Sequence, residues 1–318
     1  MFSPRANRRA WVLVSMAVAL TVVRPGSARA QTIDDGVMMA RGELFTGAIY
    51  THDQWNQYWE GGLKRDNGNI GTLTTQSNTV VGVFGVTNRL NLLSNVPYIW
   101  TEASRGVLHG MNGVQDLSIA AKYSLLERQE SPVGALRLIG VFAAAFPLTD
   151  YTPDFQPLSI GSASTRLSWR GTASMQGRDG TFVDASGAFT WRSNVTLDRP
   201  YYFTEDQLHM TDEVSMPPVL DVGVMGGFRD PRLMAAATVG VQHMSSGGDI
   251  RRQDAPFVSN RMNALRVGGV VMYPLPKLDP LAVRVSYAYT VTGRNVGQAN
   301  TVSFGLVYRF YLLGRPTP

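Results

Sequence analysis

Apolar residues recur at every second position in long segments of the chain, and this pattern most constrains what the chain can fold into. Segment 301–310 shows it most clearly, because one face of a strand there would carry Val302, Phe304, Leu306, Tyr308 and Phe310. Successive side chains of a strand point to opposite faces, so the pattern predicts strands with one apolar face. Average strands have about five or six residues, whereas a tilted strand needs roughly nine to eleven to cross the hydrocarbon of a bilayer. The length of these segments therefore favours a barrel in lipid over a soluble sandwich.

Twelve such segments can be counted along the chain. They are 43–58, 71–86, 88–101, 115–126, 134–147, 163–176, 181–193, 218–228, 231–244, 262–274, 280–292 and 300–310. Connections after even-numbered segments are short and those after odd-numbered ones are longer, which is typical of outer-membrane barrels. The sequence therefore predicts an all-β fold, a transmembrane antiparallel up-and-down β-barrel of about 12 strands with both termini on the short-turn, periplasmic side. Trp55 and Trp59 are interpreted as residues of the interfacial aromatic girdle.

The first thirty residues have the composition of an export signal. An apolar run, Trp11–Val23, follows a basic start and ends at Arg24, and Ala28–Ala30 supplies a small-x-small cleavage site. The run is too short to span a bilayer as a helix. The expected organisation is a signal peptide (1–30), a short periplasmic N-terminal segment (31–42), the barrel (43–310) and a C-terminal tail (311–318).

The charge balance argues against nucleic-acid binding. The chain has 29 basic and 24 acidic residues, and the predicted signal peptide holds five arginines and no acid, so 29 − 5 = 24 basic residues remain against 24 acidic ones. A phosphate-binding surface needs a surplus of cations. The sequence has no Cys and four scattered His residues, so we expect no disulfide, no metal site and no cofactor.

The face opposite the apolar one carries the main functional signal. If the apolar face of each strand meets lipid, the other face lines the lumen. That face carries the cations Arg89, Lys122, Arg137, Arg166, Arg170, Arg192, Arg266, Arg284 and Arg309 and the acids Asp116, Asp184 and Asp221. Fixed positive charge in a narrow channel concentrates anions, and arginine suits carboxylates and phosphates. The hypothesis is a cationic channel for passive diffusion of small organic solutes. A second interpretation stays open, in which these side chains pair with lumen acids and backbone carbonyls and brace the wall.

His243 and Ser245 raise an enzymatic alternative. The segment 243–247 resembles the His-x-Ser-Asn of outer-membrane phospholipases and lipid A deacylases, and His243 shares the lipid-facing parity. A serine nucleophile needs a neighbouring His and an orienting third group. Ser246 replaces the Asn, and no acid partner is evident at the required parity, so we expect no catalytic residues. A third hypothesis is a structural barrel that binds envelope partners and conducts nothing.

Three segments carry a family resemblance. Gly85–Leu92 followed by Val96–Tyr98, then Gly113–Tyr123, and finally Gly305–Phe310 resemble the strand motifs of the outer-membrane transporter family linked to the phenol-degradation meta-cleavage pathway. The resemblance implies a channel in the outer membrane of a Gram-negative cell for small organic compounds, including aromatic ones. Such a barrel is expected to contact outer-membrane lipids and lipopolysaccharide and to be inserted by the barrel-assembly machinery. One departure is the tail that follows the last aromatic residue of the closing strand, Phe310.

Overall fold

The computed structural model describes residues 31–129, 131–132, 134–252, 255–276, 278 and 280–312. The predicted signal peptide and residues 313–318 of the predicted tail lie outside this part of the chain. Within the described residues, no helix is long and apolar enough to cross a membrane.

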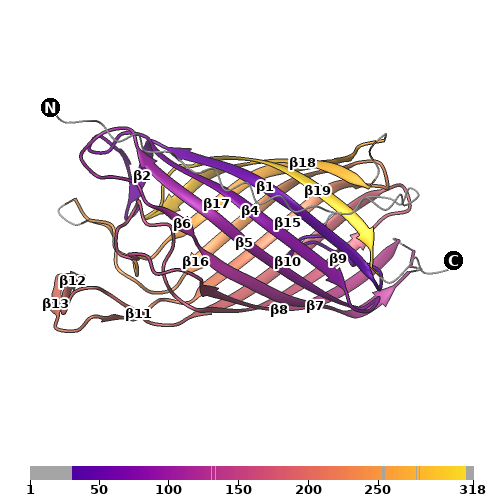
Figure 1. The fold of residues 1–318 in the computed structure, drawn as a ribbon, viewed down its shortest axis with the longest axis horizontal. Helices are drawn as coiled ribbons and strands as arrows, with labels where there is room; N and C mark the ends of the chain where they lie inside the picture. Colours follow the sequence, from indigo (N-terminus) through magenta and orange to yellow (C-terminus); the bar gives the residue numbers. More distant parts are fainter. Residues whose placement is uncertain are drawn as a thin grey trace, which may run out of the picture.

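Twelve long antiparallel strands form a closed barrel (Figure 1). In chain order they are β1 (Glu43–Trp55), β4 (Leu73–Gly85), β5 (Leu90–Ala103), β7 (Asp116–Arg128), β8 (Ala135–Pro147), β9 (Arg166–Gln176), β10 (Thr181–Arg192), β15 (Val219–Arg229), β16 (Met234–Met244), β17 (Asn263–Pro274), β18 (Leu281–Arg294) and β19 (Asn300–Tyr311). The first of them, β1, pairs with both β4 and β19 and so closes the ring. The predicted all-β barrel of twelve strands is confirmed.

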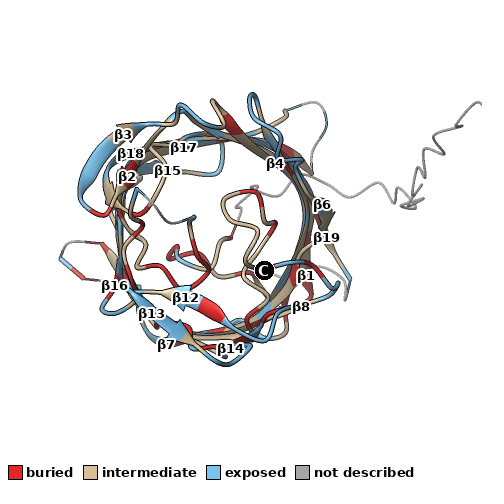
Figure 2. Cartoon of the chain, turned by 90° about the vertical axis from the view of Figure 1, so that its left-hand side faces the viewer, coloured by how far each residue is buried: buried red, intermediate tan, exposed pale blue. Residues whose placement is uncertain are grey.

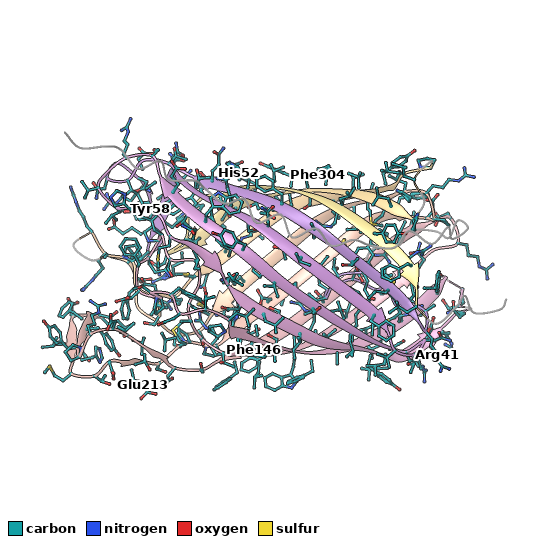
Figure 3. The ribbon with its side chains drawn as sticks, in the orientation of Figure 1. Arg41, His52, Tyr58, Phe146, Glu213 and Phe304 are labelled. Carbon is teal, nitrogen blue, oxygen red and sulfur yellow. The ribbon has the colours of Figure 1, made fainter. Side chains whose placement is uncertain are left out.

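The apolar side chains of the strands point outward, as the alternation predicted. On β19, Val302, Phe304 and Leu306 are 47%, 51% and 43% exposed, whereas Val307 and Arg309 on the other face are buried. Phe304 projects from the outer surface of the barrel in Figure 3. A continuous exposed apolar band of this kind suits hydrocarbon rather than water.

Aromatic side chains lie near both ends of this band. The rings of Tyr98 and Trp100 on β5 are 6.1 Å apart toward one end, and those of Tyr308 and Phe310 on β19 are 5.7 Å apart toward the other. The interpretation of Trp55 and Trp59 as girdle residues is wrong. Trp59 is buried, and Trp55 has the inward parity of Asp53 and lines a cavity at the mouth of the barrel.

Short turns join the strands at one end of the barrel and long loops join them at the other. The long loops contain seven short strands among the described residues: β2 (Gln57–Glu60), β3 (Leu63–Asp66), β6 (Asn112–Val114), β11 (Val195–Thr196), β12 (Tyr202–Thr204), β13 (Gln207–His209) and β14 (Glu213–Val214). The β12–β13 hairpin projects beyond the barrel in Figure 1. Since outer-membrane barrels turn their short connections to the periplasm, the long-loop end is the extracellular one.

Residues 31–40 lie inside the barrel and Arg41 is exposed at its short-turn rim (Figure 3), whereas a periplasmic lead-in was predicted for this segment. Met39 is 1% exposed and joins an apolar cluster with inward side chains of several strands near the short-turn end, among them Phe45, Val83 and Phe182. Figure 2, which looks along the barrel, shows chain crossing the interior of the ring. These residues have no two-residue alternation, so nothing in their sequence indicated where they would lie.

A β-bulge in β7 changes which residues face inward. The register with β8 shifts between Ser124 and Leu126, so Leu125 and Leu126 are both exposed on the outer face. After the bulge, odd-numbered residues of β7 face inward and even-numbered ones face outward, which is the opposite of the order before it. Glu127 therefore turns toward the interior and meets Arg137 there.

Candidate solute pathway

The N-terminal segment is held to the inner wall by a buried ion pair. The Lys122 ammonium, which is fully buried, donates to Asp35 Oδ1 at 2.8 Å and to the carbonyl oxygens of Thr32 and Asp35 at 2.7 and 2.8 Å. Removing two charges from water is costly unless the pair is completed by further hydrogen bonds. Here three acceptors surround one ammonium group, so the segment and the wall stabilise each other.

Further contacts continue this attachment toward the short-turn rim. The Gly36 amide donates to Asp184 Oδ2 at 2.9 Å, and Arg137 donates to the Gly36 carbonyl at 2.7 Å. The Met39 amide donates to Asn91 Oδ1 at 2.9 Å. Cavities of about 270 and 240 Å³ remain beside the segment. Residues 31–42 thus narrow the lumen between its middle and its short-turn end.

Several predicted lumen cations are paired with acids, as the second interpretation of the sequence proposed. Lys122 pairs with Asp35, Arg137 with Glu127, Arg166 with Asp116 and Arg309 with Glu43. Asp184 pairs with Arg229 at 2.5 Å. Asp35, Glu43, Glu127 and Arg229 were not among the residues predicted to line the lumen, because they lie in the N-terminal segment, at strand ends or beyond a bulge.

Four other predicted cations have no carboxylate within 4.0 Å among the described residues. Arg170 donates to Ser186 Oγ at 3.1 Å, Arg192 to the Pro217 carbonyl at 2.7 Å, Arg266 to Gln242 Oε1 at 3.3 Å and Arg284 to Ser286 Oγ at 3.0 Å. We call these four the open arginines. Asp221 lies within electrostatic reach of Arg170 and Arg266, so charges of both signs line this part of the wall.

Arg89 is the one predicted lumen cation that the structure places elsewhere. It lies in the turn between β4 and β5 and is exposed. The third predicted strand begins at residue 88, whereas β5 begins at Leu90. The prediction therefore treated Arg89 as a strand residue with an inward side chain, although it lies in a turn.

A loop between β8 and β9 reaches into the outer part of the lumen. Tyr151 donates its hydroxyl proton to Asp116 Oδ1 at 2.8 Å, and Arg166 donates to Asp116 Oδ2 at 2.8 Å. Burial, followed by the Asp116 charge, raises the pKa of Tyr151 above its usual range, so its hydroxyl remains a donor. Thr101 on β5 also holds this loop by donating to the Leu158 carbonyl at 2.6 Å.

The extracellular loops are also joined by Asp249. Arg294 Nε donates to Asp249 Oδ1 at 2.7 Å, and Asn295 Nδ2 donates to the same oxygen at 2.8 Å. Hydrogen bonds, foremost those from Arg294, hold the pKa of Asp249 below its ordinary value of 3.8. A depressed folded-state pKa means that this stabilisation is present above the ordinary pKa and is lost as the pH falls through the folded-state value.

We therefore expect pepsin to cleave loop 245–262 slowly while Asp249 is ionised and faster as the pH falls through its lowered pKa, because protonated Asp249 no longer holds Arg294. The Asp249→Asn variant lacks the charge at every pH, so its cleavage should be fast throughout pepsin's working range. Cleavage rates of the two proteins across that range check the prediction. Equal rates for both proteins at every pH would contradict it.

The enzymatic alternative gains no support from the geometry. His243 lies on the outer face opposite Leu220, as its parity predicted. Among the residues that the structure describes, no hydrogen bond joins the His243 ring to Ser245 or to a carboxylate. A serine nucleophile with its base and orienting group is therefore not assembled there.

Comparisons with known proteins agree with this architecture. The model of a family described as "Putative MetA-pathway of phenol degradation" matches residues 65–306. The structure is similar to that of an outer membrane channel from Pseudomonas putida, with a TM-score of 0.68, 16% identity and coverage of 88% of this chain and 100% of the other. A search of curated proteins finds no match.

Two further solved structures are similar at a TM-score of 0.46. The translocator domain of the autotransporter NalP from Neisseria meningitidis is 11% identical, with 86% of this chain and 90% of that domain covered. The NanC porin is 9% identical, with 82% of this chain and 98% of the porin covered.

Proposed function

The chain belongs to this phenol-degradation family and has the fold of an outer-membrane β-barrel, and we propose that it is a channel for passive diffusion of small organic compounds, anionic or aromatic ones foremost. In this proposal the barrel-assembly machinery inserts the protein, and phospholipid and lipopolysaccharide surround its apolar band. Solutes enter between the extracellular loops, pass the open arginines and leave past residues 31–42.

The observation that carries the proposal is the set of open arginines. Each donates to a neutral oxygen, and none has a carboxylate within 4.0 Å among the described residues. A guanidinium fork matches a carboxylate in geometry. A binding step also has to be weak enough for the solute to leave. Asp221, near Arg170 and Arg266, supports this, because it competes with a passing anion.

Planar-bilayer recordings test the proposal. We expect the purified protein to give discrete current steps with a preference for anions, because guanidinium groups lower the barrier to anion entry. The double variant Arg170→Gln/Arg266→Gln should lower the anion-to-cation permeability ratio and keep the current steps. Arg232→Gln, at an exposed position in the turn between β15 and β16, removes a charge outside the lumen and is the matched control.

The recordings can contradict each part of the proposal separately. A protein that inserts but passes no current would be a structural barrel. A cation-selective wild type would remove the anion part of the proposal. A double variant with the selectivity of Arg232→Gln would show that the open arginines do not control selectivity.

A further inference from the structure

A cavity of about 460 Å³ lies at the extracellular mouth of the barrel. Its wall comes from segments that are far apart in sequence: Trp55 at the end of β1, Tyr58 on β2, Leu73 on β4, Ile250 in the loop after β16, and Val296 between β18 and β19. In Figure 3, Tyr58 lies at the long-loop end of the barrel, opposite Arg41 at the other end. Known small-molecule sites have volumes of about 300–1,000 Å³, so the size is suitable for a ligand of few rings.

The wall of this cavity is aromatic and apolar. The rings of Trp55 and Tyr58 lie 6.2 Å apart and are tilted by 49° to each other. Leu73 and Ile250 are 2% and 8% exposed and form a dry part of the wall. Side chains of this kind bind a flat apolar ligand by burying its surface.

The polar groups of the cavity favour negative charge. Among the described residues that line it, two are arginines, Arg251 and Arg252, and none is Asp or Glu. Arg251 already pairs with Asp206, whereas the Arg252 side chain is exposed at the rim. The side chain of Asn67 also lines the cavity, and its Nδ2 has no hydrogen-bond acceptor among the described residues. An anionic oxygen would find donors here, and no carboxylate belongs to the described residues of the wall.

The cavity is closely shaped around Trp55. A Cβ atom added to Gly297 would lie 2.4 Å from the indole ring, which is closer than real Cβ contacts come. Any side chain at position 297 must therefore displace the indole, which forms part of the cavity wall. This gives a substitution that alters the shape of the cavity without changing its charge.

The cavity also adjoins the inner wall of the barrel. Thr75 lines it and pairs in register with Asp53 on β1. Asp53 in turn lies within electrostatic reach of Arg266, one of the open arginines. A solute that leaves the cavity inward is thus delivered to the arginine-lined part of the lumen.

We propose that this cavity is the capture site at which the channel first binds its solute, a small flat aromatic compound that carries one carboxylate or similar anionic group. The aromatic wall holds the ring, and Arg252 and the Asn67 carboxamide nitrogen donate to the anionic oxygen. The inference rests on the proposed channel function for its physiological purpose, but binding at this cavity can be measured without transport.

Isothermal titration calorimetry on the purified, detergent-solubilised protein tests the site with three probes: benzoate, benzyl alcohol and acetate. Benzoate should bind more tightly than either partial probe. Arg252→Gln should weaken benzoate about threefold, since the ion pair is partly exposed, and should leave benzyl alcohol unchanged. Gly297→Ala should weaken benzoate and benzyl alcohol about tenfold, because the displaced indole no longer fits the ring that it holds.

Matched controls separate the site from general effects of substitution. Gly171→Ala lies on the outer wall with nothing within 4 Å of the added Cβ, and Arg232→Gln removes a charge from the opposite end of the barrel. Both should bind benzoate as the wild type does. Heat-modifiable gel mobility checks that Gly297→Ala folds, and Arg252→Gln tests the site without touching its packing.

Three outcomes would overturn the capture site: no benzoate binding by the wild type, equal affinity in all variants, or acetate binding as tightly as benzoate. Bilayer conductance, recorded in parallel, distinguishes this from failure of the proposed function. Current steps without variant-sensitive benzoate binding would remove the capture site and leave the channel. Benzoate binding that the variants weaken, without any current, would support the capture site and remove the channel.

Discussion

Deletion of residues 33–40 is expected to raise the single-channel conductance several-fold. These residues occupy the lumen between its middle and the short-turn end, where Met39 completes an apolar cluster that spans several strands. An apolar constriction resists both water and ions. Without Met39 and the chain around it, the inner side chains of the opposing strands are separated by water, and the narrowest part of the pathway widens.

The deletion leaves Gln31 and Thr32 in place, so the residues after the predicted cleavage site are unchanged. Arg232→Gln, at an exposed position in the short turn between β15 and β16, is the control and should leave the conductance near the wild-type value. Equal conductance of the wild type and the 33–40 deletion, with both proteins folded, would mean that solutes do not pass this segment.

The substitution Gly36→Val tests the contact between the N-terminal segment and the barrel wall with a smaller change to the protein than the deletion. A Cβ at Gly36 would lie 1.9 Å from Ser174 Oγ and 2.8 Å from Asp184 Oδ1, so Gly36→Val cannot keep the segment against the wall. Its conductance should lie between those of the wild type and the deletion. A value equal to the wild type would show that the segment can shift without widening the pathway.

The long strands could be predicted because the pattern that identifies each one lies within its own sequence. A two-residue alternation over ten or more residues specifies which face meets lipid, and neighbouring strands then have to pair in register to satisfy their backbone groups. Lys122, Arg170 and Arg266 were placed in the lumen for this reason, and all three contact inward-facing or N-terminal groups in the structure. Local periodicity was sufficient for their placement.

The contents of the lumen could not be predicted in the same way. Asp35 pairs with Lys122, which is 87 residues away in the sequence. The segment around Asp35 has no two-residue alternation, so its sequence did not indicate that it would lie in the lumen. Glu127 faces inward only because of the bulge at Ser124, and bulges leave no fixed signal in sequence. Trp55 has the inward parity, but its aromatic side chain at a strand end suggested a girdle. In each case a tertiary contact, rather than a local pattern, decides the outcome.

The Lys122→Met variant is expected to lose stability and to release the N-terminal segment. Both side chains of the Lys122–Asp35 pair are almost completely buried, and removing one partner leaves the Asp35 carboxylate without its counter-ion. Breaking a buried pair in this way costs about 3–5 kcal/mol. The protein can avoid part of this cost by moving Asp35 into water, which requires residues 31–36 to leave the wall.

Two measurements detect the two consequences. The temperature at which the folded band disappears in a gel-mobility assay should fall, and the single-channel conductance should rise toward that of the 33–40 deletion. The double variant Lys122→Met/Asp35→Ala removes both charges, so its folded band should survive to a higher temperature than that of Lys122→Met alone. If the double variant is instead less stable than the single one, the ion pair is not what holds the segment, and the backbone contacts of Gly36 and Met39 with Asp184 and Asn91 must carry most of the attachment.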